Sequence, residues 1–555
     1  MKKESVLILG AGLMQSPAIN AAKRNRFKTF VIDANPNAES VFLADEFRQI
    51  DLKDKERIFE FASELQKKEN LKAVFTAGTD FSASVSYVCE KLGLCAHSYE
   101  AALNASIKPR MRACFERAGV PSPEYFSFSR ESDSQVELYC IENIQQAVEK
   151  LGFPCVVKPA DNMGARGCRM IRSKEEIISA VENAVESSRT GTIILEQYME
   201  GSEYSIDAVV YNGTLTVTGF ADRHIYYPPY FIETGHTMPT SAGEKEKAEL
   251  IAAFAAGVKA LGLTCGTAKA DIKYTPNGPE IGEIAARLSG GYMSGWTFPY
   301  SSGLNLTEQA LLIAAGRVPE KLLRMRKPVE FRPYVSSGAS ASPCEPPFEL
   351  YEVVSKKTSA ERAWISIPGT IASISGIRHS ERTRFVKNVF PRPVHSGEEA
   401  VFPRNNVQKC GNAISLSKNR DKAVNASCRA CSRAFIRLEP HNERTERFLK
   451  GETSADERGF PPPAYRSFLQ LEHTPLSGII PENSSVLRSV PPEIQPLLDS
   501  AETDWNYLTL RKSAERFDRL CRKHPAIPQE RFWKALLKGG IQAAVYVSDS
   551  LSENK

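Results

Sequence analysis

Two carboxylates and one arginine surround a tight turn that the sequence predicts near the middle of the chain. Asp271 lies before the turn at 276–278, and Glu283 and Arg287 lie after it. The turn contains Asn-Gly, a strong hairpin signal because both residues tolerate positive φ. Counting outward from it places Asp271 opposite Gly282 or Glu283, where facing Cβ atoms lie roughly 5 Å apart. Carboxylates that close repel unless a cation lies between them, so the hairpin predicts a magnesium site beside phosphates; the alternative is a solvated acidic hairpin.

A lysine and a glycine-rich turn farther upstream have the chemistry of a phosphate site. The apolar run 154–158 ends on Lys158, and the chain resumes as a strand after a turn that contains Gly164 and Gly167. Lysine supplies a point charge, and glycines let backbone N–H groups approach phosphate oxygens. A Walker loop is excluded because no Gly-Lys-Ser or Gly-Lys-Thr closes the turn. The segment predicts either a nucleotide lid or a plain β-hairpin.

A second apolar strand, at 192–196, ends on an acid. Adenine needs an apolar slot, an acceptor for its amino group and nearby backbone groups, and the strand ending on Glu196 offers all three. Glu203 follows at a spacing that suits a ribose hydroxyl. The alternative for this segment is an edge strand with a polar end.

Substrate-binding candidates lie around these motifs. Arg223 supplies a counter-ion for a carboxylate substrate, and His236 could orient that carboxylate or transfer a proton. A lone histidine is also commonly structural. The glycine-rich segment 288–296 follows Arg287, and it predicts either backbone amides that bind an anion or a tight turn.

The elements that position this chemistry begin with an alternation of strands and helices over residues 1 to about 105. This pattern is typical of a doubly wound parallel sheet. Its first turn has Gly10 and Gly12 of a dinucleotide fingerprint and Asp33 after the second strand, but Gln15 replaces the third glycine. Three functions remain open for the turn: cofactor binding, tight strand-to-helix packing, or an anion site at the helix N-terminus.

Composition and charge narrow the class of protein. The chain has 555 residues, 42% of them hydrophobic and 25% charged, which indicates a globular protein of several domains. A net charge of +5 with dispersed basic residues predicts no nucleic-acid partner. We expect a cytoplasmic protein without a membrane partner, because no apolar run spans a bilayer and the first residues do not resemble a signal peptide. The twelve cysteines form no disulfide-like framework, and the Cys428-x-x-Cys431 pair falls in a predicted helix at 421–435, which favours packing over redox or metal chemistry.

The order of these signals resembles the ATP-grasp superfamily, in particular its carboxylate-amine ligase and biotin-carboxylase-like branch. The resemblance covers residues 1 to about 450, with its motifs between 108 and 287. It implies an α/β and α+β fold with an N-terminal doubly wound parallel sheet. The implied domains are a Rossmann-like pre-ATP-grasp domain at 1–105, an ATP-grasp domain at 106–320 with a β lid at about 124–205, a C-terminal β-rich subdomain at 330–450, and a Pro-rich linker with a helical extension of unknown role at 451–555.

The resemblance also implies roles for individual residues. The residues implied to bind ATP are Lys108, Lys158, Gly164, Gly167, Glu196, Met199 and Glu203. The implied metal ligands are Asp271 and Glu283, and the implied catalytic residues are Arg287, Lys158 and His236. Two positions depart from the family pattern: Asp271 stands where glutamate is frequent, and Ala285 stands where many members have an asparagine that helps to hold a second magnesium.

The implied activity is that of an ATP-dependent ligase. A carboxylate attacks the γ-phosphate of ATP, and an amine then attacks the acyl phosphate. The expected cofactors are ATP and Mg²⁺, with Mn²⁺ as a substitute, and the expected partners are small-molecule carboxylates and amines, with a homodimer left open. Two alternatives remain: an enzyme of the carboxylase or purine-pathway type that phosphorylates bicarbonate, and an ATP-binding regulatory protein with weakened turnover.

Overall fold

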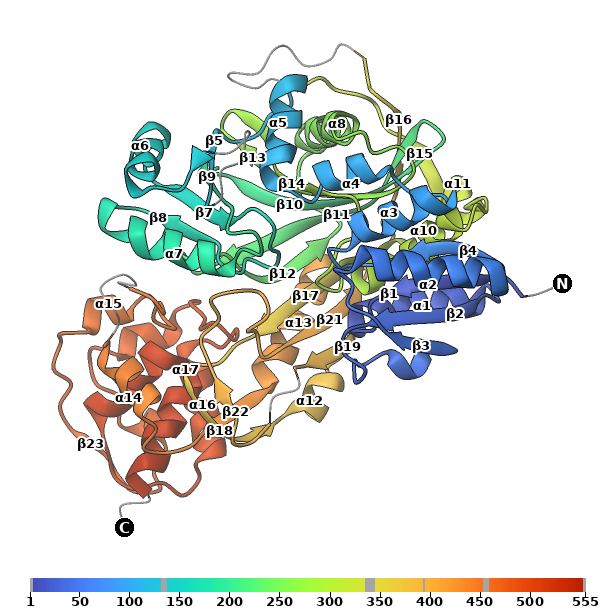
Figure 1. The fold of residues 1–555 in the computed structure, drawn as a ribbon. Helices are drawn as coiled ribbons and strands as arrows, with labels where there is room; N and C mark the ends of the chain where they lie inside the picture. Colours follow the sequence, from blue (N-terminus) through green and yellow to red (C-terminus); the bar gives the residue numbers. More distant parts are fainter. Residues whose placement is uncertain (1–2, 131–136, 335–344, 393–394, 453–458, 553–555) are drawn as a thin grey trace. The chain divides into compact units, whose positions relative to one another are not determined.

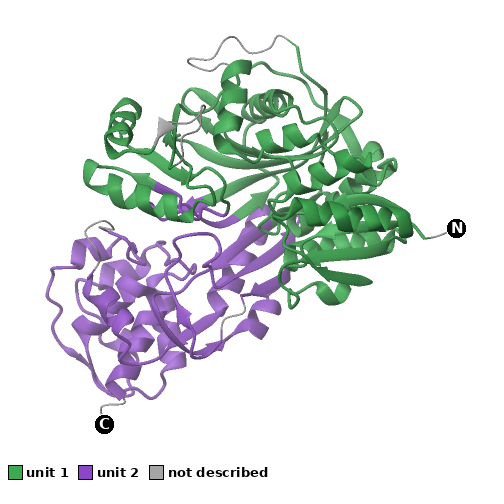
Figure 2. Ribbon diagram, viewed as in Figure 1, with its two compact units in different colours: residues 1–163, 170–224, 236–359 green, residues 164–169, 225–235, 360–555 purple. Residues whose placement is uncertain are grey.

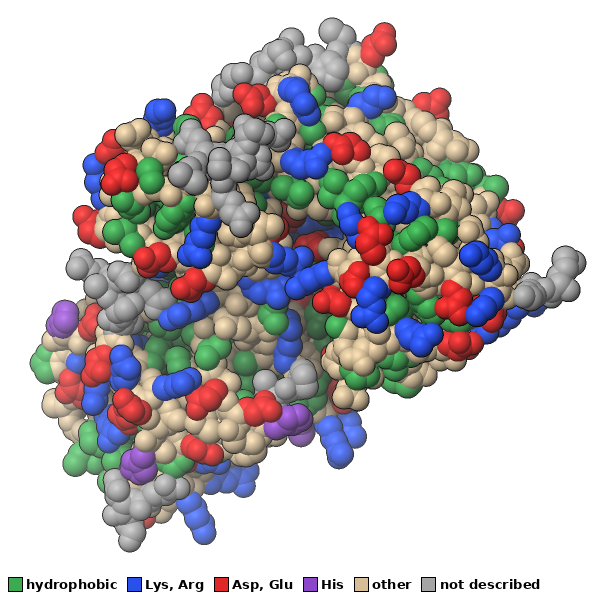
Figure 3. Space-filling model, in the orientation of Figure 1, with side chains coloured by type: hydrophobic (Ala, Val, Ile, Leu, Met, Phe, Trp, Pro, Cys, Tyr) green, Lys and Arg blue, Asp and Glu red, His purple; other side chains and the backbone are tan. Residues whose placement is uncertain are grey.

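The computed structural model describes residues 3–130, 137–334, 345–392, 395–452 and 459–552. These residues form two compact units, which Figure 2 shows in different colours. The first unit comprises residues 1–163, 170–224 and 236–359, and the second comprises 164–169, 225–235 and 360–555. Acidic and basic side chains are intermingled over the face drawn in Figure 3. In the described part of the chain, no helix combines the length and apolar character needed to cross a membrane.

The first unit begins with a four-stranded parallel sheet in the order β3-β2-β1-β4 (Figure 1). Successive side chains of β1 point to opposite faces, so Val6 and Ile8 pack with α1 and α10 while Leu7 and Leu9 pack with α2 and α3. Helices on both faces confirm the predicted doubly wound sheet. The elements are β1 Ser5–Leu9, η1 Leu13–Gln15, α1 Ser16–Arg24, β2 Lys28–Asp33, η2 Val41–Leu43, β3 Glu46–Gln49, α2 Lys55–Lys68, β4 Leu71–Phe75, α3 Ser82–Leu92, α4 Tyr99–Asn104 and α10 Leu306–Ala314.

A separate five-stranded sheet, in the order β6-β5-β9-β7-β8, occupies the segment predicted as the β lid. Its core is formed by the apolar sides of two amphipathic helices, α6 and α7, against alternate residues of β7 and β9. The elements are β5 Tyr125–Ser129, β6 Glu137–Leu138, α6 Ile141–Leu151, β7 Cys155–Pro159, β8 Arg169–Ile171, η3 Lys174–Glu176, α7 Ile177–Ser187 and β9 Ile193–Gln197. The predicted strand ending on Lys158, the turn and the resumed strand are therefore confirmed as β7, a loop and β8.

The central sheet of the first unit runs in the order β14-β13-β10-β11-β12, and β16 pairs parallel with β11. Its neighbouring strands β10, β13 and β14 are antiparallel. Helix α8 packs on β13 and β14. Its residues 249–258 are buried on all sides of the helix and are almost all apolar, as expected of a buried helix. The elements are α5 Lys108–Ala118, β10 Ser202–Tyr211, β11 Thr214–Tyr226, β12 Ile232–Met238, α8 Glu244–Ala260, β13 Gly266–Thr275, β14 Gly278–Ala285, η4 Met293–Thr297, α9 Phe298–Ser302, α11 Glu320–Met325, β15 Arg326–Pro328 and β16 Glu349–Val353.

The second unit has one continuous core that joins the β-rich segment to the C-terminal tail. Trp364 and Ile371 from the strands lie in the same cluster as Trp505 and Trp533 from the tail. Cys428 and Cys431 lie in α13, as predicted, and the thiol of Cys431 donates to the carbonyl of Arg362. The elements are β17 Thr358–Trp364, β18 Gly369–Ser375, α12 Ile377–Glu381, β19 Val386–Pro391, β20 Glu399–Ala400, β21 Gly411–Ser417, α13 Arg420–Arg433, β22 Phe435–Leu438, α14 Glu443–Lys450, α15 Phe468–Leu471, β23 Ile479–Ile480, η6 Val486–Arg488, η7 Gln495–Asp499, α16 Leu510–Leu520, β24 Ile527–Pro528 and α17 Gln529–Ser552.

Candidate active site

The predicted hairpin is formed by β13 and β14. Thr275 faces Gly278 across the turn, and Asp271 faces Glu283 in the first pair beyond a register shift. The shift lies at Gly282, where an added Cβ would stand 3.1 Å from the carbonyl oxygen of Asp271. The extra residue of this β-bulge brings both carboxylates into one facing pair, which confirms the predicted opposition of Asp271 and Glu283.

Basic side chains surround the first of these carboxylates. Arg223 lies 2.7 Å from Asp271 Oδ1, and Lys269 pairs with the other carboxylate oxygen. The same guanidinium lies 2.7 Å from Glu203 Oε1, and Lys273 lies 3.7 Å from Glu203 Oε2. Three cations thus lie against two partly buried carboxylates on neighbouring strands. A surplus of positive charge in a partly dry site attracts a polyanion such as a phosphate chain.

The donor set of this hairpin fits magnesium bound together with phosphate. Asp271 and Glu283 would supply hard oxygen ligands from adjacent strands once Asp271 exchanged its contacts with Arg223 and Lys269. Mg²⁺ is usually held by one or two carboxylates plus waters and substrate phosphates. Among the residues that the structure describes, no group of three or more His, Cys, Asp or Glu side chains could enclose a metal. Ala285 is buried at the end of β14 and adds no ligand atom. Oxygens from substrate or water would therefore complete the coordination.

A buried ionic network connects the strand of Lys158 to the helix that precedes the lid. Glu196 and Arg112 are 2% and 1% exposed, and Arg112 Nη2 lies 2.8 Å from Glu196 Oε1. Lys158 pairs with the other carboxylate oxygen of Glu196. Burial alone would raise the pKa of Glu196, but Arg112 and Lys158 outweigh it and hold that pKa below its usual range. Both oxygens of Glu196 are thus engaged, one by Arg112 and the other by Lys158.

Arg112 also fastens the network to the hairpin. Its Nη1 and Nη2 donate to the carbonyls of Ile281 and Gly282 at 3.2 and 2.6 Å. Lys108, one helical turn earlier on α5, donates from Nζ to the carbonyl of Asn162 at 2.9 Å. The carbonyl of Met199 accepts a hydrogen bond from Lys273 Nζ at 2.9 Å. The residues expected to contact ATP are therefore linked through α5, the lid sheet and β13.

The two glycines of the predicted lid turn belong to the second unit. Gly164 and Gly167 have φ of 68° and 69°, a conformation that side chains disfavour. Within that unit, the N–H of Asn406 donates to the carbonyl of Gly164 at 3.0 Å, and its side-chain oxygen accepts from the N–H of Glu233 at 2.8 Å. The turn is therefore held by the polar segment around Asn406.

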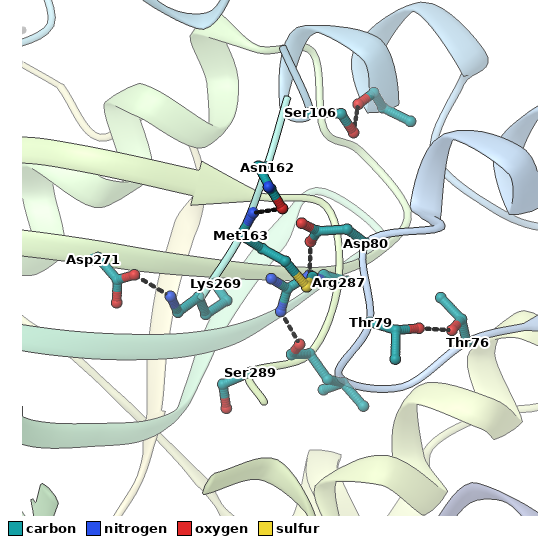
Figure 4. A network of polar contacts seen from close by, with 12 residues as sticks. Thr76, Thr79, Asp80, Ser106, Asn162, Met163, Lys269, Asp271, Arg287 and Ser289 are labelled. Atoms are coloured by element: carbon teal, nitrogen blue, oxygen red, sulfur yellow. Dashed lines mark hydrogen bonds and ion pairs between the residues drawn. The ribbon is translucent and has the colours of Figure 1, made fainter. Parts of the chain in front are cut away.

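Arg287 is held by an acid from the N-terminal sheet. Its Nε donates to Asp80 Oδ1 at 2.6 Å and its Nη1 to the carbonyl of Leu288 at 2.9 Å (Figure 4). Burial alone would raise the pKa of Asp80, but the Arg287 guanidinium holds it below its usual range. Asp80 follows β4 in a loop that approaches the segment after Arg287 so closely that a Cβ on Gly78 would stand 2.8 Å from Gly290 Cα.

Gln15 anchors the loop that carries Asp80. Its side chain is fully buried; its oxygen accepts from Ala77 N at 2.9 Å, and its nitrogen donates to Thr79 Oγ1 at 3.2 Å. Asp33 accepts from Ala11 N at 2.7 Å. The incomplete glycine fingerprint thus serves strand-to-helix packing and the positioning of the Asp80 loop.

Two further polar groups lie beneath the segment that follows Arg287. Asp207 on β10 accepts from the N–H of Ser289 at 3.2 Å and from its hydroxyl. Burial raises the pKa of Asp207 to about 7, against the lowering effect of Ser289 and Lys269. His236 is buried and contacts Thr297 Oγ1 at 2.8 Å through Nε2. This contact is with the last residue of η4, which directly follows the glycine-rich segment 288–296.

Sequence reasoning did not find Arg112, Asp80 or Asp207. Arg112 lies four residues after Lys108 on a helix, so both side chains fall on one face, and this spacing was an available signal. Asp80 follows a parallel strand at the carboxyl edge of the sheet, which is where ligands bind in open α/β folds. Asp207 had no such signal because its burial depends on the loop at Ser289.

Comparison with known proteins agrees with this geometry. Residues 151–295 match the family model of the ATP-grasp domain. The chain is 24% identical over 337 residues to carnosine synthase 1 from Mus musculus, which covers 58% of this chain and 40% of that protein. It is 25% identical over 303 residues to alanine–anticapsin ligase from Bacillus subtilis, which covers 50% of this chain and 61% of that protein. The chain thus spans less than two thirds of the length of these two relatives.

The fold extends beyond the matched region. The crystal structure of L-amino acid ligase from Bacillus licheniformis superposes with a TM-score of 0.62 at 17% identity, over 79% of this chain and 100% of that chain. Residues 151–295 therefore match the ATP-grasp domain, and 79% of the chain shares the fold of the L-amino acid ligase.

Proposed function

We propose that this protein is an ATP-dependent ligase that activates a carboxylate as an acyl phosphate for attack by an amine. The observation that carries the proposal is the facing pair of Asp271 and Glu283, with Lys269 and Arg223 beside Asp271 and with Arg287 two residues after the end of β14. Magnesium bound by the two carboxylates would neutralise charge on the transferred phosphoryl group. The names of the relatives, two of them amino-acid ligases, favour an amino acid as one substrate.

The basic residues divide into two groups in this proposal. Lys158 and Lys108 hold the phosphate chain of ATP. Arg287 stabilises the charge that develops when a carboxylate oxygen attacks the γ-phosphorus and ADP leaves. The amine then attacks the acyl carbon and expels phosphate, and exclusion of water protects the acyl phosphate from hydrolysis.

The structure changes the proposed role of one nucleotide-binding residue. Both oxygens of Glu196 are engaged by Arg112 and Lys158, so we assign Glu196 the positioning of Lys158. Backbone groups near Met199, at the end of the same strand, remain the proposed contacts for adenine. Glu203 is assigned to the ribose, and in that role its carboxylate would exchange part of its contact with Arg223. His236 is proposed to orient the η4 segment toward the substrate rather than to transfer a proton.

The experiment is ATP turnover by the full chain with a panel of amino acids and other carboxylates, with hydroxylamine added to trap the acyl phosphate. We expect carboxylate-dependent hydroxamate in the wild type and a loss of at least ~100-fold in Lys158→Ala and Glu283→Ala. Lys174→Ala is the matched control, because Lys174 is an exposed lysine of the lid paired with Glu149. Hydroxamate formation that survives in the two site variants would refute the residue assignment.

Two further arms distinguish the alternative functions. Bicarbonate that stimulates ATP hydrolysis when no organic carboxylate does so would replace the ligase proposal with a bicarbonate-phosphorylating enzyme. Tight ATP binding without turnover for any carboxylate would instead indicate a regulatory nucleotide-binding protein. In that case Ala285→Asn would be the first variant in which to look for turnover.

A further inference from the structure

Two cysteine thiols that are far apart in the sequence meet in the first unit. The Sγ atoms of Cys95 and Cys265 lie 2.8 Å apart, and 170 positions separate the two residues. Cys95 belongs to the segment between α3 and α4, and Cys265 immediately precedes β13. Both side chains are partly exposed. A disulfide bond is about 2.04 Å long, so the thiols need to approach by only ~0.8 Å to form one.

The backbone around the pair is held in place without the thiols. His97 contacts the carbonyl of Thr267 through Nε2 at 2.9 Å, and its Nδ1 accepts from the N–H groups of Thr264 and Cys265, each at 3.2 Å. Burial lowers the pKa of His97 to about 4, so the ring is neutral and can accept at Nδ1. This single histidine fastens both cysteine segments together. The thiols are therefore presented to each other by a fixed frame.

The pair lines a cavity of ≈ 50 Å³ that also reaches the active-site arginine. Its wall includes Cys95, Cys265, Thr76, Ser86 and Arg287. A volume of this size holds more than one water molecule, because a water needs roughly 10–15 Å³ on the same measure. The thiols therefore line a small cavity rather than a packed core.

The two thiols have different acidities. Either sulfur can be the donor in this contact, and donation from Cys265 lowers the pKa of Cys95 to about 7 and raises that of Cys265. A thiol whose pKa lies near the ambient pH is the best attacking group in thiol–disulfide exchange. Cys95 is thus suited to attack first, and Cys265 to resolve the product. By contrast, the nearby Cys89 is fully buried and donates to the carbonyl of Val74, and burial raises its pKa to about 12.

We propose that Cys95 and Cys265 form a reversible disulfide, with a small-molecule disulfide of the glutathione class as the oxidant. The thiolate of Cys95 attacks one sulfur of the oxidant, forms a mixed disulfide and releases one thiolate. Cys265 loses its proton, attacks Cys95 Sγ and expels the second thiolate. Two protein thiols are oxidised to one disulfide, and one oxidant disulfide is reduced to two thiols.

The bond would act directly on the candidate active site. Cys265 precedes the strand that carries Lys269 and Asp271, while Cys95 follows a helix of the N-terminal sheet, whose β4 loop supplies Asp80. A covalent bond here would fix the start of β13 against the layer that holds Arg287. The site is distinct from the proposed ligase chemistry and does not depend on it.

The test uses the full chain incubated with oxidised glutathione and then alkylated, digested and mapped by mass spectrometry. We expect one linked peptide pair, containing Cys95 and Cys265, which dithiothreitol cleaves. We also expect oxidation to raise the thermal unfolding midpoint of the wild type by roughly 5 °C or more. Cys95→Ser and Cys265→Ser should each abolish both effects, whereas the control Cys89→Ser should retain them.

Three outcomes would overturn the proposal. The first is that both cysteines remain free thiols after incubation with oxidised glutathione, so that both are completely alkylated. This outcome counts when a thiol reagent is shown to reach Cys95 under the same conditions. The second is a linked pair formed from other cysteines, such as Cys428 and Cys431 on α13. The third is a midpoint shift on oxidation that persists in Cys95→Ser. A serine variant that fails to fold is replaced by Cys265→Ala, whose folding is checked by circular dichroism before oxidation.

Discussion

Replacing Arg112 with methionine should destabilise the first unit by about 3–5 kcal/mol. The substitution keeps an unbranched apolar stem but removes the guanidinium, and it leaves the 2%-exposed carboxylate of Glu196 with Lys158 as its one remaining cationic partner in the described network. Breaking a buried ion pair costs about 3–5 kcal/mol because the remaining charge stays desolvated. The carbonyls of Ile281 and Gly282 also lose their donor, which moves the expected value toward the upper end of the range.

The assay is equilibrium urea unfolding at neutral pH, followed by fluorescence. With an m-value of about 3 kcal/mol/M, the Arg112→Met midpoint should fall by roughly 1–2 M. The matched control is Arg110→Met, because Arg110 lies on the same helix and pairs with Glu100 at the surface, and we expect a change below about 1 kcal/mol there.

A double-mutant cycle tests whether the network is the cause. Glu196→Gln should cost much less in the Arg112→Met background than in the wild type, with a coupling of about 1–3 kcal/mol. An Arg112→Met loss below about 1 kcal/mol, or additivity of the two substitutions within ~0.5 kcal/mol, would contradict the reasoning. Either result would mean that water reaches Glu196 in solution.

Three further predictions concern the site itself. Asp80→Asn removes the ion-pair partner of Arg287, and we expect kcat/KM for hydroxamate formation to fall by about 10-fold or more, or ~1.4 kcal/mol. The far-UV circular dichroism spectrum should remain that of a folded protein. Unchanged kinetics would exclude a positioning role for Asp80. Asp271→Asn and Glu283→Gln should each raise the Mg²⁺ concentration needed for half-maximal ATP turnover by roughly 10-fold or more, and an unaltered Mg²⁺ dependence would remove them from the ligand set. Because burial raises the pKa of Asp207 to about 7, the folded state retains a proton that the unfolded chain releases from about pH 4 upward, so stability from this group is lost as pH rises toward 7. Asp207→Asn should reduce the pH dependence of the unfolding free energy by up to about 1.4 kcal/mol per pH unit, measured from urea midpoints at about pH 5 and pH 8. An equal pH dependence in the wild type and the variant would refute this prediction.

Local patterns were sufficient for the elements and for the facing carboxylates. The Asn-Gly turn fixes the register of β13 and β14 within one residue, since a two-residue hairpin loop allows few pairings. The alternation of strands and helices over residues 1 to about 105 predicts a doubly wound parallel sheet, which the helices on either side of β1 confirm. The lysine at the end of β7 and the acid at the end of β9 could be placed in the same way.

The partners of these residues depend on contacts between distant segments. Local sequence cannot show that Glu196 meets Arg112, that Arg287 meets Asp80 across 207 positions, or that Cys95 meets Cys265. The residues between 451 and 555 illustrate the same limit, because their Pro-rich and polar pattern conceals Trp505 and Trp533 in the core of the second unit.

The physical reason for this division is range. Turn chemistry and side-chain periodicity act over a few residues, so the sequence by itself determined the strands, the hairpin register and the acid and base groups available for phosphate chemistry. Desolvation and ion pairing act through space and depend on which segments the fold packs together. Tertiary structure alone therefore decided which charges are buried, which arginine each acid restrains, and that the carboxylate of Glu196 fixes Lys158.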